Sequence, residues 1–119
     1  MAEIRPFRAV RPAEGRAEVV AALPYDVYSR KEAYAETRKH PYSFLNIDRP
    51  ETQFAPDQDM YAPEVYLKAD SMLREWRERG ILIQEDEPCL YIYEQTMDGR
   101  TQTGIVACSS VDDYLSGVI

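Results

Sequence analysis

The sequence predicts an α+β fold: a small mixed or antiparallel sheet with a C-terminal β-hairpin packed against two helices. Two observations support this prediction. Apolar residues recur at helical spacing over residues 61–79, and two alternating runs, 88–97 and 100–111, meet at Asp98-Gly99. The chain has 119 residues, which suits a single domain over residues 1–119.

The first half of the chain is expected to contain short strands and one helix. Residues 4–11 alternate weakly and are interrupted by proline, which suits an edge strand. Residues 17–23 form a short apolar run, so the following Pro24-Tyr25-Asp26-Val27 would lie at a strand-to-helix junction. Ser29 and Glu32 form a capping box. We therefore expect a helix from about Ser29 to Lys39, ended by His40-Pro41.

The middle of the chain contains the most regular helical pattern. Residues 43–48 read as a buried strand stub and residues 49–60 as a loop without periodicity. The helix at residues 61–79 follows, with Pro63 in its first turn and Gly80 as its left-handed stop. Its apolar face comprises Val65, Ala69, Met72, Leu73 and Trp76. Residues 81–84 are expected to form a short strand.

The Asp98-Gly99 turn fixes the register of the hairpin, because a two-residue type I′ loop leaves no freedom in pairing. Met97 then faces Arg100, and Tyr91 faces Val106. We expect the base of the hairpin to be buried on both faces and the polar tip to project into solvent. The same register places Cys89 opposite Cys108, with Cα atoms about 5.5 Å apart and within disulfide range. Either the two pair, or they are small buried side chains that stay reduced.

Composition excludes several classes of function. The net charge is −7 and the pI is about 4.7, and basic residues are scattered, which argues against nucleic-acid binding. No apolar run is long enough to span a membrane. The first residues do not resemble a signal peptide, so we expect a cytoplasmic location.

The chain also lacks the residues that a metal site or a nucleophilic catalytic site requires. With two cysteines and one histidine, no zinc-binding pattern is present and we predict no metal site. His40 reads as a helix C-cap or a surface residue and not as part of a catalytic triad. The glycines are too far apart for a phosphate-binding loop. The catalytic residues and the cofactor therefore remain unassigned by the sequence.

Two groups of residues are candidates for ligand binding. Tyr25 and Asp26 would lie at the junction before a helix, where ligand groups gather, although proline and aspartate there also suit a plain turn. Asn46, Asp48 and Arg49 would end the buried strand. Asn46 is polar within an apolar stretch and needs a partner, which is either a nearby loop or a ligand.

Two further features are ambiguous. The hairpin tip carries Glu94, Arg100 and Gln102, which are either solvated turn residues or a contact for another domain. Val118 and Ile119 resemble the beginning of another element and not a polar tail. We therefore expect residues 1–119 to be the N-terminal fragment of a longer protein.

Four segments carry a family resemblance. Residues 6–12 (PFRAVRP), 24–27 (PYDV), 40–50 (HPYSFLNIDRP) and 99–106 (GRTQTGIV) occur in this order. Together they resemble the N-terminal part of domain-of-unknown-function family 1015, found in bacteria and archaea, and the resemblance covers nearly the whole chain. Full-length members of that family are several times longer.

The resemblance implies a function only indirectly. A downstream Asp-Gly-His-His-Arg signature of the family is similar to one in the ParB-like fold and in an archaeal kinase of free serine. This implies a small-molecule kinase or a nucleotide-binding enzyme, but the signature is absent from this chain, and a shared fold does not carry function with it. ATP or ADP would then be a ligand of the full-length protein only.

Two functional hypotheses follow. In the first, Tyr25, Asp26, Asn46, Asp48 and Arg49 line a substrate or nucleotide site of a kinase-like enzyme, which the remainder of the full-length chain completes. In the second, the chain is a non-catalytic docking or oligomerisation domain that uses the 88–111 hairpin, for example in a homodimer, because an exposed hairpin edge offers unpaired backbone groups.

Overall fold

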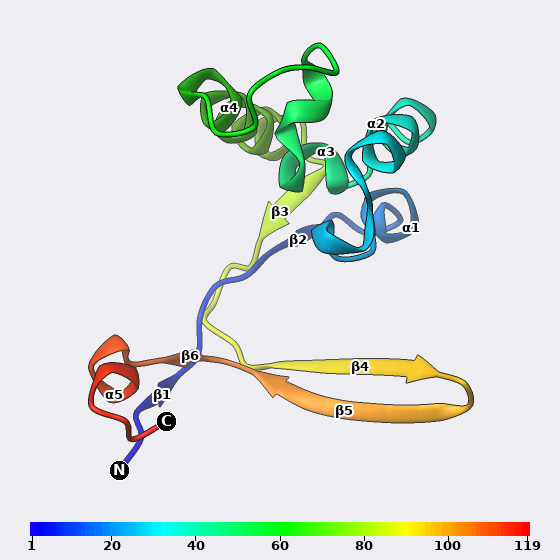
Figure 1. The fold of residues 1–119 in the computed structure, drawn as a ribbon. Coiled ribbons are helices and arrows are strands. Elements are labelled where there is room, and N and C mark those ends of the chain that lie inside the picture. The colour runs from blue at the N-terminus through cyan, green and yellow to red at the C-terminus, as the bar shows by residue number, and fades with distance from the viewer. The chain divides into compact units, whose positions relative to one another are not determined.

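The computed structural model describes residues 1–119 and combines helices with small pairs of strands, which confirms the predicted α+β class (Figure 1). The elements in chain order are β1 (Ile4–Arg5), β2 (Val10–Pro12), α1 (Ala17–Val20), the 3₁₀ turn η1 (Tyr25–Val27), α2 (Arg30–Lys39), α3 (Leu45–Asp48), the 3₁₀ turn η2 (Pro50–Gln53), α4 (Pro63–Glu78), β3 (Leu82–Gln84), β4 (Tyr91–Met97), β5 (Arg100–Val106), β6 (Cys108–Ser109) and α5 (Val111–Leu115).

The strands form three two-stranded sheets, β1–β6, β2–β3 and β4–β5, where the sequence predicted one small sheet. The chain divides into two compact units. One unit comprises residues 12–83 and contains α1 to α4. The other comprises residues 1–11 and 84–119 and contains the hairpin β4–β5, the pair β1–β6 and α5.

The unit of residues 12–83 contains a hydrophobic core. Met72 and Trp76 project from α4, and Ile47 reaches them from α3. The ring of Trp76 meets that of Tyr42 edge-on, with centroids 6.1 Å apart, an arrangement that favours aromatic packing. The other buried core residues are Val20, Ile81 and Leu82. This core holds the helices around which the candidate site is built.

The two predicted helices are confirmed. In α2 the Ser29 hydroxyl accepts a hydrogen bond from the Glu32 amide, and the Glu32 carboxylate accepts one from the Ser29 amide, which completes the capping box. His40 is the C-cap residue, as predicted. Helix α4 begins at Pro63 and is followed by Gly80, whose φ is +73°, so the left-handed stop is also confirmed.

Three local predictions are wrong. Residues 43–48 form the helical turn α3 and not a strand stub, because local bonds such as Asp48 N to Phe44 O satisfy a helical backbone. The run 17–23 contains α1, so the element directly before η1 is a helical turn and not a strand. The single edge strand at 4–11 is interrupted at Pro6 into β1 and β2, which pair with different strands. Short apolar runs do not distinguish a strand from a helical turn.

The register of the hairpin is confirmed throughout, from Met97 opposite Arg100 to Tyr91 opposite Val106. Asp98 and Gly99 have φ values of +52° and +76°, as a type I′ turn requires. The predicted burial of the hairpin base is wrong. Every residue of β5 is exposed, and in β4 only Tyr91 is partly buried.

The base of the hairpin continues into other pairings. Phe7 forms a bridge with Cys89, and Arg5 pairs with Cys108. Both cysteines are free and exposed, so neither a disulfide nor burial is observed. The Tyr91 hydroxyl donates to Phe7 O and accepts from Ala9 N, both at 2.9 Å. The N-terminal segment thus takes the backbone positions that the sequence assigned to a longer hairpin.

Candidate functional site

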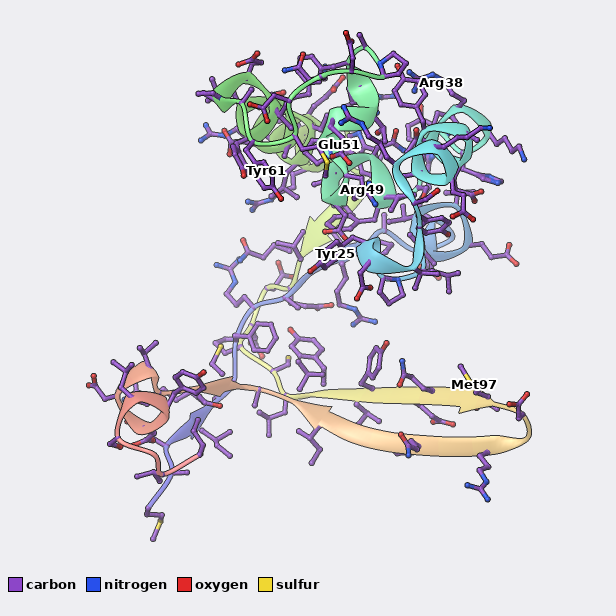
Figure 2. The ribbon with its side chains drawn as sticks, viewed as in Figure 1. Tyr25, Arg38, Arg49, Glu51, Tyr61 and Met97 are labelled. Carbon is purple, nitrogen blue, oxygen red and sulfur yellow. The ribbon has the colours of Figure 1, made fainter.

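Arg49 and Glu51 form a buried ion pair at the junction of α3 and η2. Arg49 Nε lies 2.6 Å from Glu51 Oε1, and both residues are buried. Arg49 Nη1 also donates to the main-chain oxygens of Tyr25 and Tyr28, at 3.1 and 2.9 Å. Figure 2 shows Arg49 between Glu51 and Tyr25. The guanidinium therefore fastens η1 to η2.

The side chain of Asn46 forms hydrogen bonds with the turn that precedes α3. Its Nδ2 donates to Ser43 O at 2.8 Å and to His40 O at 3.1 Å. Its Oδ1 accepts a hydrogen bond from Gln53 Nε2 at 2.8 Å. Of the two roles considered for this buried amide, the contacts are those of a loop anchor.

The other candidates lie at the surface. Tyr25 is 58% exposed, and Asp26 and Asp48 are exposed as well. Neither carboxylate has a hydrogen bond or an ion pair in the structure. The structure thus brings Tyr25 and Arg49 together through the Tyr25 main chain, whereas Asp26 and Asp48 remain unpartnered carboxylates.

Sequence reasoning missed Glu51 and a second set of contacts on α2. Side chains at positions i, i+4 and i+8 of this helix donate to main-chain oxygens of η2 and of the segment that follows it. Arg38 Nη1 donates to Thr52 O at 2.9 Å, Tyr34 to Phe54 O and Arg30 to Gln58 O. The helical spacing of these donors was the available signal. They explain why a segment without periodicity is nevertheless ordered.

The same face of α2 lines a groove of about 450 Å³. Its walls are Arg30, Lys31, Tyr34, Ala35, Arg38 and Pro56, so it holds three cations and no carboxylate. The Arg38 guanidinium lies 4.1 Å from the centroid of the Tyr34 ring. In a chain of net charge −7 this is a local positive site, suited to an anion that carries an apolar group.

A second groove, of about 520 Å³, lies between the segment 18–23 and the C-terminal end of α2. Its lining is mainly apolar and includes Leu23, Tyr28 and Tyr42. Glu36 and His40 also line it, with His40 Nε2 3.5 Å from Glu36 Oε1. Neither groove is lined by Asp26 or Asp48.

The hairpin β4–β5 exposes apolar side chains on both of its faces. On one face Ile92 and Ile105 are 76% and 74% exposed and stand directly opposite each other. The other face carries Tyr93 and Val106, which are also exposed, and Met97 lies near the tip (Figure 2). Exposed apolar residues gathered on both faces of one element make this hairpin a candidate interaction surface.

Electrostatics add little to these candidates. At Glu32, hydrogen bonds from the Ser29 amide and then the Ser29 hydroxyl lower the pKa of the carboxyl below its usual value. No three histidine, cysteine or carboxylate side chains gather as a metal site would require. No helix is long and apolar enough to cross a membrane.

Comparison with known proteins identifies a family. A family model described as "Protein of unknown function (DUF1015)" matches residues 4–119. No curated protein and no solved structure matches the chain.

Proposed function

This chain belongs to the DUF1015 family, and we propose that residues 1–119 act as a docking domain that associates with a second copy through the 88–111 hairpin. The observation that carries this proposal is the exposure of apolar side chains on both faces of β4–β5. Burying such side chains contributes about 25 cal/mol per Å² of apolar surface. An association that covers these side chains in part would therefore be favourable.

The unit that contains the hairpin lacks a hydrophobic core that could stabilise it alone. All fully buried residues of the chain lie between Val20 and Leu82, so residues 1–11 and 84–119 have no buried core. An isolated two-stranded hairpin is marginally stable in water, and three or more strands with a covered apolar face are usually needed. A second hairpin would supply the additional strands.

Sedimentation velocity over a range of protein concentrations tests this proposal. We expect wild-type chains to form a concentration-dependent dimer and Ile105→Lys to remain monomeric, because the substitution places a charge among the apolar side chains of the interface. Leu67→Lys is the matched control, since Leu67 is an exposed apolar residue on α4. A monomer at all concentrations, or equal loss of association in both variants, would refute the proposal.

A second candidate function is the nucleotide-binding or kinase-like enzyme that the family resemblance implies. The groove with Arg30, Lys31 and Arg38 favours it, because cations without carboxylates suit phosphate groups. Asp26 and Asp48 are exposed and unpartnered, so they remain available to a substrate or a metal-bound nucleotide. Tyr25, Asn46 and Arg49 would then hold the segments that carry these two carboxylates, and the remainder of the full-length chain would complete the site.

Isothermal titration of the full-length protein with ATP, ADP and free amino acids separates the two functions. The enzyme proposal expects nucleotide binding that weakens in Lys31→Glu and not in Lys68→Glu, which makes the same charge change on α4. Asp26→Ala and Asp48→Ala should abolish binding of the free amino acid, because these carboxylates would contact the substrate and do not line the groove. Absence of binding to any of these compounds would leave the docking function alone.

We also propose that the protein is located in the cytoplasm. Cys89 and Cys108 are exposed free thiols, which fits the reducing environment of the cytoplasm. The net charge of −7 disfavours nucleic acid as a partner. The remainder of the full-length chain is a further partner of this domain in our account.

A further inference from the structure

We propose that two copies of this chain pair along the β5 edges of their hairpins, antiparallel, with Thr103 of one copy opposite Thr103 of the other. This inference rests on the proposed function, because it specifies how the hairpins associate. It predicts a continuous four-stranded sheet in the order β4–β5–β5–β4, related by a two-fold axis through the Thr103 pair.

The register of the hairpin determines which backbone groups are free. In an antiparallel pair, residues that exchange hydrogen bonds alternate with residues that do not. The pair flanking the two-residue turn, Met97 and Arg100, is hydrogen-bonded. It follows from the register that Thr101, Thr103 and Ile105 point their N–H and C=O groups away from β4. No hydrogen bond outside the hairpin uses these groups.

A two-fold axis at Thr103 uses all three of these positions. Thr103 then exchanges hydrogen bonds with its copy, and Thr101 of each chain pairs with Ile105 of the other. An axis at Thr101 would place Thr103 opposite the turn. An axis at Ile105 would place Thr101 opposite Ser109, which already pairs with Ile4 in β1. The Thr103 register is therefore the one that stays within β5.

Charge favours the β5 edge over the β4 edge. From Thr101 to Val106, β5 carries no charged side chain. On β4 the outward-pointing residues are Ile92, Glu94 and Thr96, and an equivalent two-fold pairing there would place Glu94 directly opposite Glu94. Like charges directly opposite are destabilising, and a charge on an edge strand is a common protection against pairing. Hence the β4 edge is protected against pairing with another strand, and the β5 edge is not.

Side chains on the same face would support this pairing. Residues directly opposite in an antiparallel pair lie on the same face of the sheet. Thr101, Thr103 and Ile105 share the face that carries Ile92, so Ile92 and Ile105 of one copy would lie in the same row across the sheet as Thr101 of the second copy. Ile105 would then be flanked by Ile92 of its own chain and Thr101 of the second copy.

Cysteine cross-linking tests this register directly. In a Cys89→Ser/Cys108→Ser background, Thr103→Cys places the two introduced thiols on Cα atoms about 5.5 Å apart, within disulfide range. We expect mild oxidation to give a covalent dimer. Thr101→Cys is the matched control, because each position 101 would lie four residues from its counterpart, about 13 Å along the strand. This variant should form no covalent dimer on oxidation. A dimer from Thr101→Cys but not from Thr103→Cys would overturn the register.

Proline substitution distinguishes failure of this inference from failure of the proposed function. Proline removes an amide donor and is tolerated where that amide faces solvent, so Thr103→Pro should leave the hairpin folded and abolish association in sedimentation velocity. Glu94→Pro, at the cross-strand position on the β4 edge, should associate as the wild type does. If Thr103→Pro still associates normally, the β5 pairing is wrong while docking stands. If the wild type does not associate, the proposed function itself fails.

Discussion

Removing the buried cation at Arg49 should destabilise the unit of residues 12–83 more than any surface ion pair can. The Arg49 and Glu51 side chains are 10% and 4% exposed, and Arg49 also satisfies the carbonyls of Tyr25 and Tyr28. Arg49→Met leaves the Glu51 carboxylate buried without a partner. Breaking one side of a buried pair typically costs about 3–5 kcal/mol, a large part of the ~5–15 kcal/mol stability of an ordinary domain.

Urea unfolding measures this loss conveniently, because Trp76 is the single tryptophan and lies in the core of the same unit. We expect Arg49→Met to lower the free energy of unfolding by about 3–5 kcal/mol. Arg74→Met is the control. Its pair with Asp70 has side chains 74% and 55% exposed, and such surface pairs contribute about 0.2–1 kcal/mol.

The double variant Arg49→Met/Glu51→Leu identifies the cause of the loss. Because it removes both charges, we expect it to recover part of the stability lost in Arg49→Met alone. An Arg49→Met variant no less stable than Arg74→Met would refute the argument that this pair holds η1 and η2 together. A double variant less stable than either single one would also contradict it.

Three further perturbations test the elements around these sites. Since hydrogen bonds lower the pKa of Glu32 in the folded state, the stability it contributes is present above its ordinary pKa of 4.5 and lost as the pH falls through the lowered value; Glu32→Gln should therefore flatten the dependence of the urea midpoint on pH in the acid range. Gly99→Ala should weaken the hairpin by about 1–2 kcal/mol, because φ is +76° there, whereas Gly104→Ala meets no atom within 4 Å and should retain the cross-strand nuclear Overhauser effects. Met72→Ala should cost about 2–5 kcal/mol in urea unfolding, and Leu67→Ala, at an exposed position, about 0.5 kcal/mol or less.

The parts of the fold that sequence predicted are those fixed by contacts close in the chain. Helix α2 follows from its capping box, and α4 from its apolar spacing and Gly80. The hairpin register follows from the Asp98-Gly99 turn. Each of these depends on residues within a few positions of one another, and the structure confirms all three.

The predictions that failed depend on distant contacts or on patterns that fit two structures. The alternation of apolar residues in β4 and β5 indicates two faces able to be buried, but it does not state what covers them, and both are exposed here. Residues 43–48 read as a strand because a short apolar run fits two structures. Its helical form depends on Asn46 bonding back to the preceding turn.

The candidate site was predicted in part. Sequence reasoning selected Asn46 and Arg49 as polar residues that need partners, and the structure supplies those partners within the chain. It missed Glu51, because an acid in a segment without periodicity gives no signal of burial. The α2 groove was missed as well, although Arg30, Tyr34 and Arg38 have helical spacing, because the segment they bind has no regular pattern.

Amide hydrogen exchange along β5 tests the association of two hairpins most directly. Under our account, exchange at Thr101, Thr103 and Ile105 slows as the protein concentration rises, because these amides become hydrogen-bonded between copies. Exchange at Ile92, Glu94 and Thr96 on the opposite edge stays fast at every concentration. Exchange at the three β5 amides that is fast and independent of concentration would contradict the account.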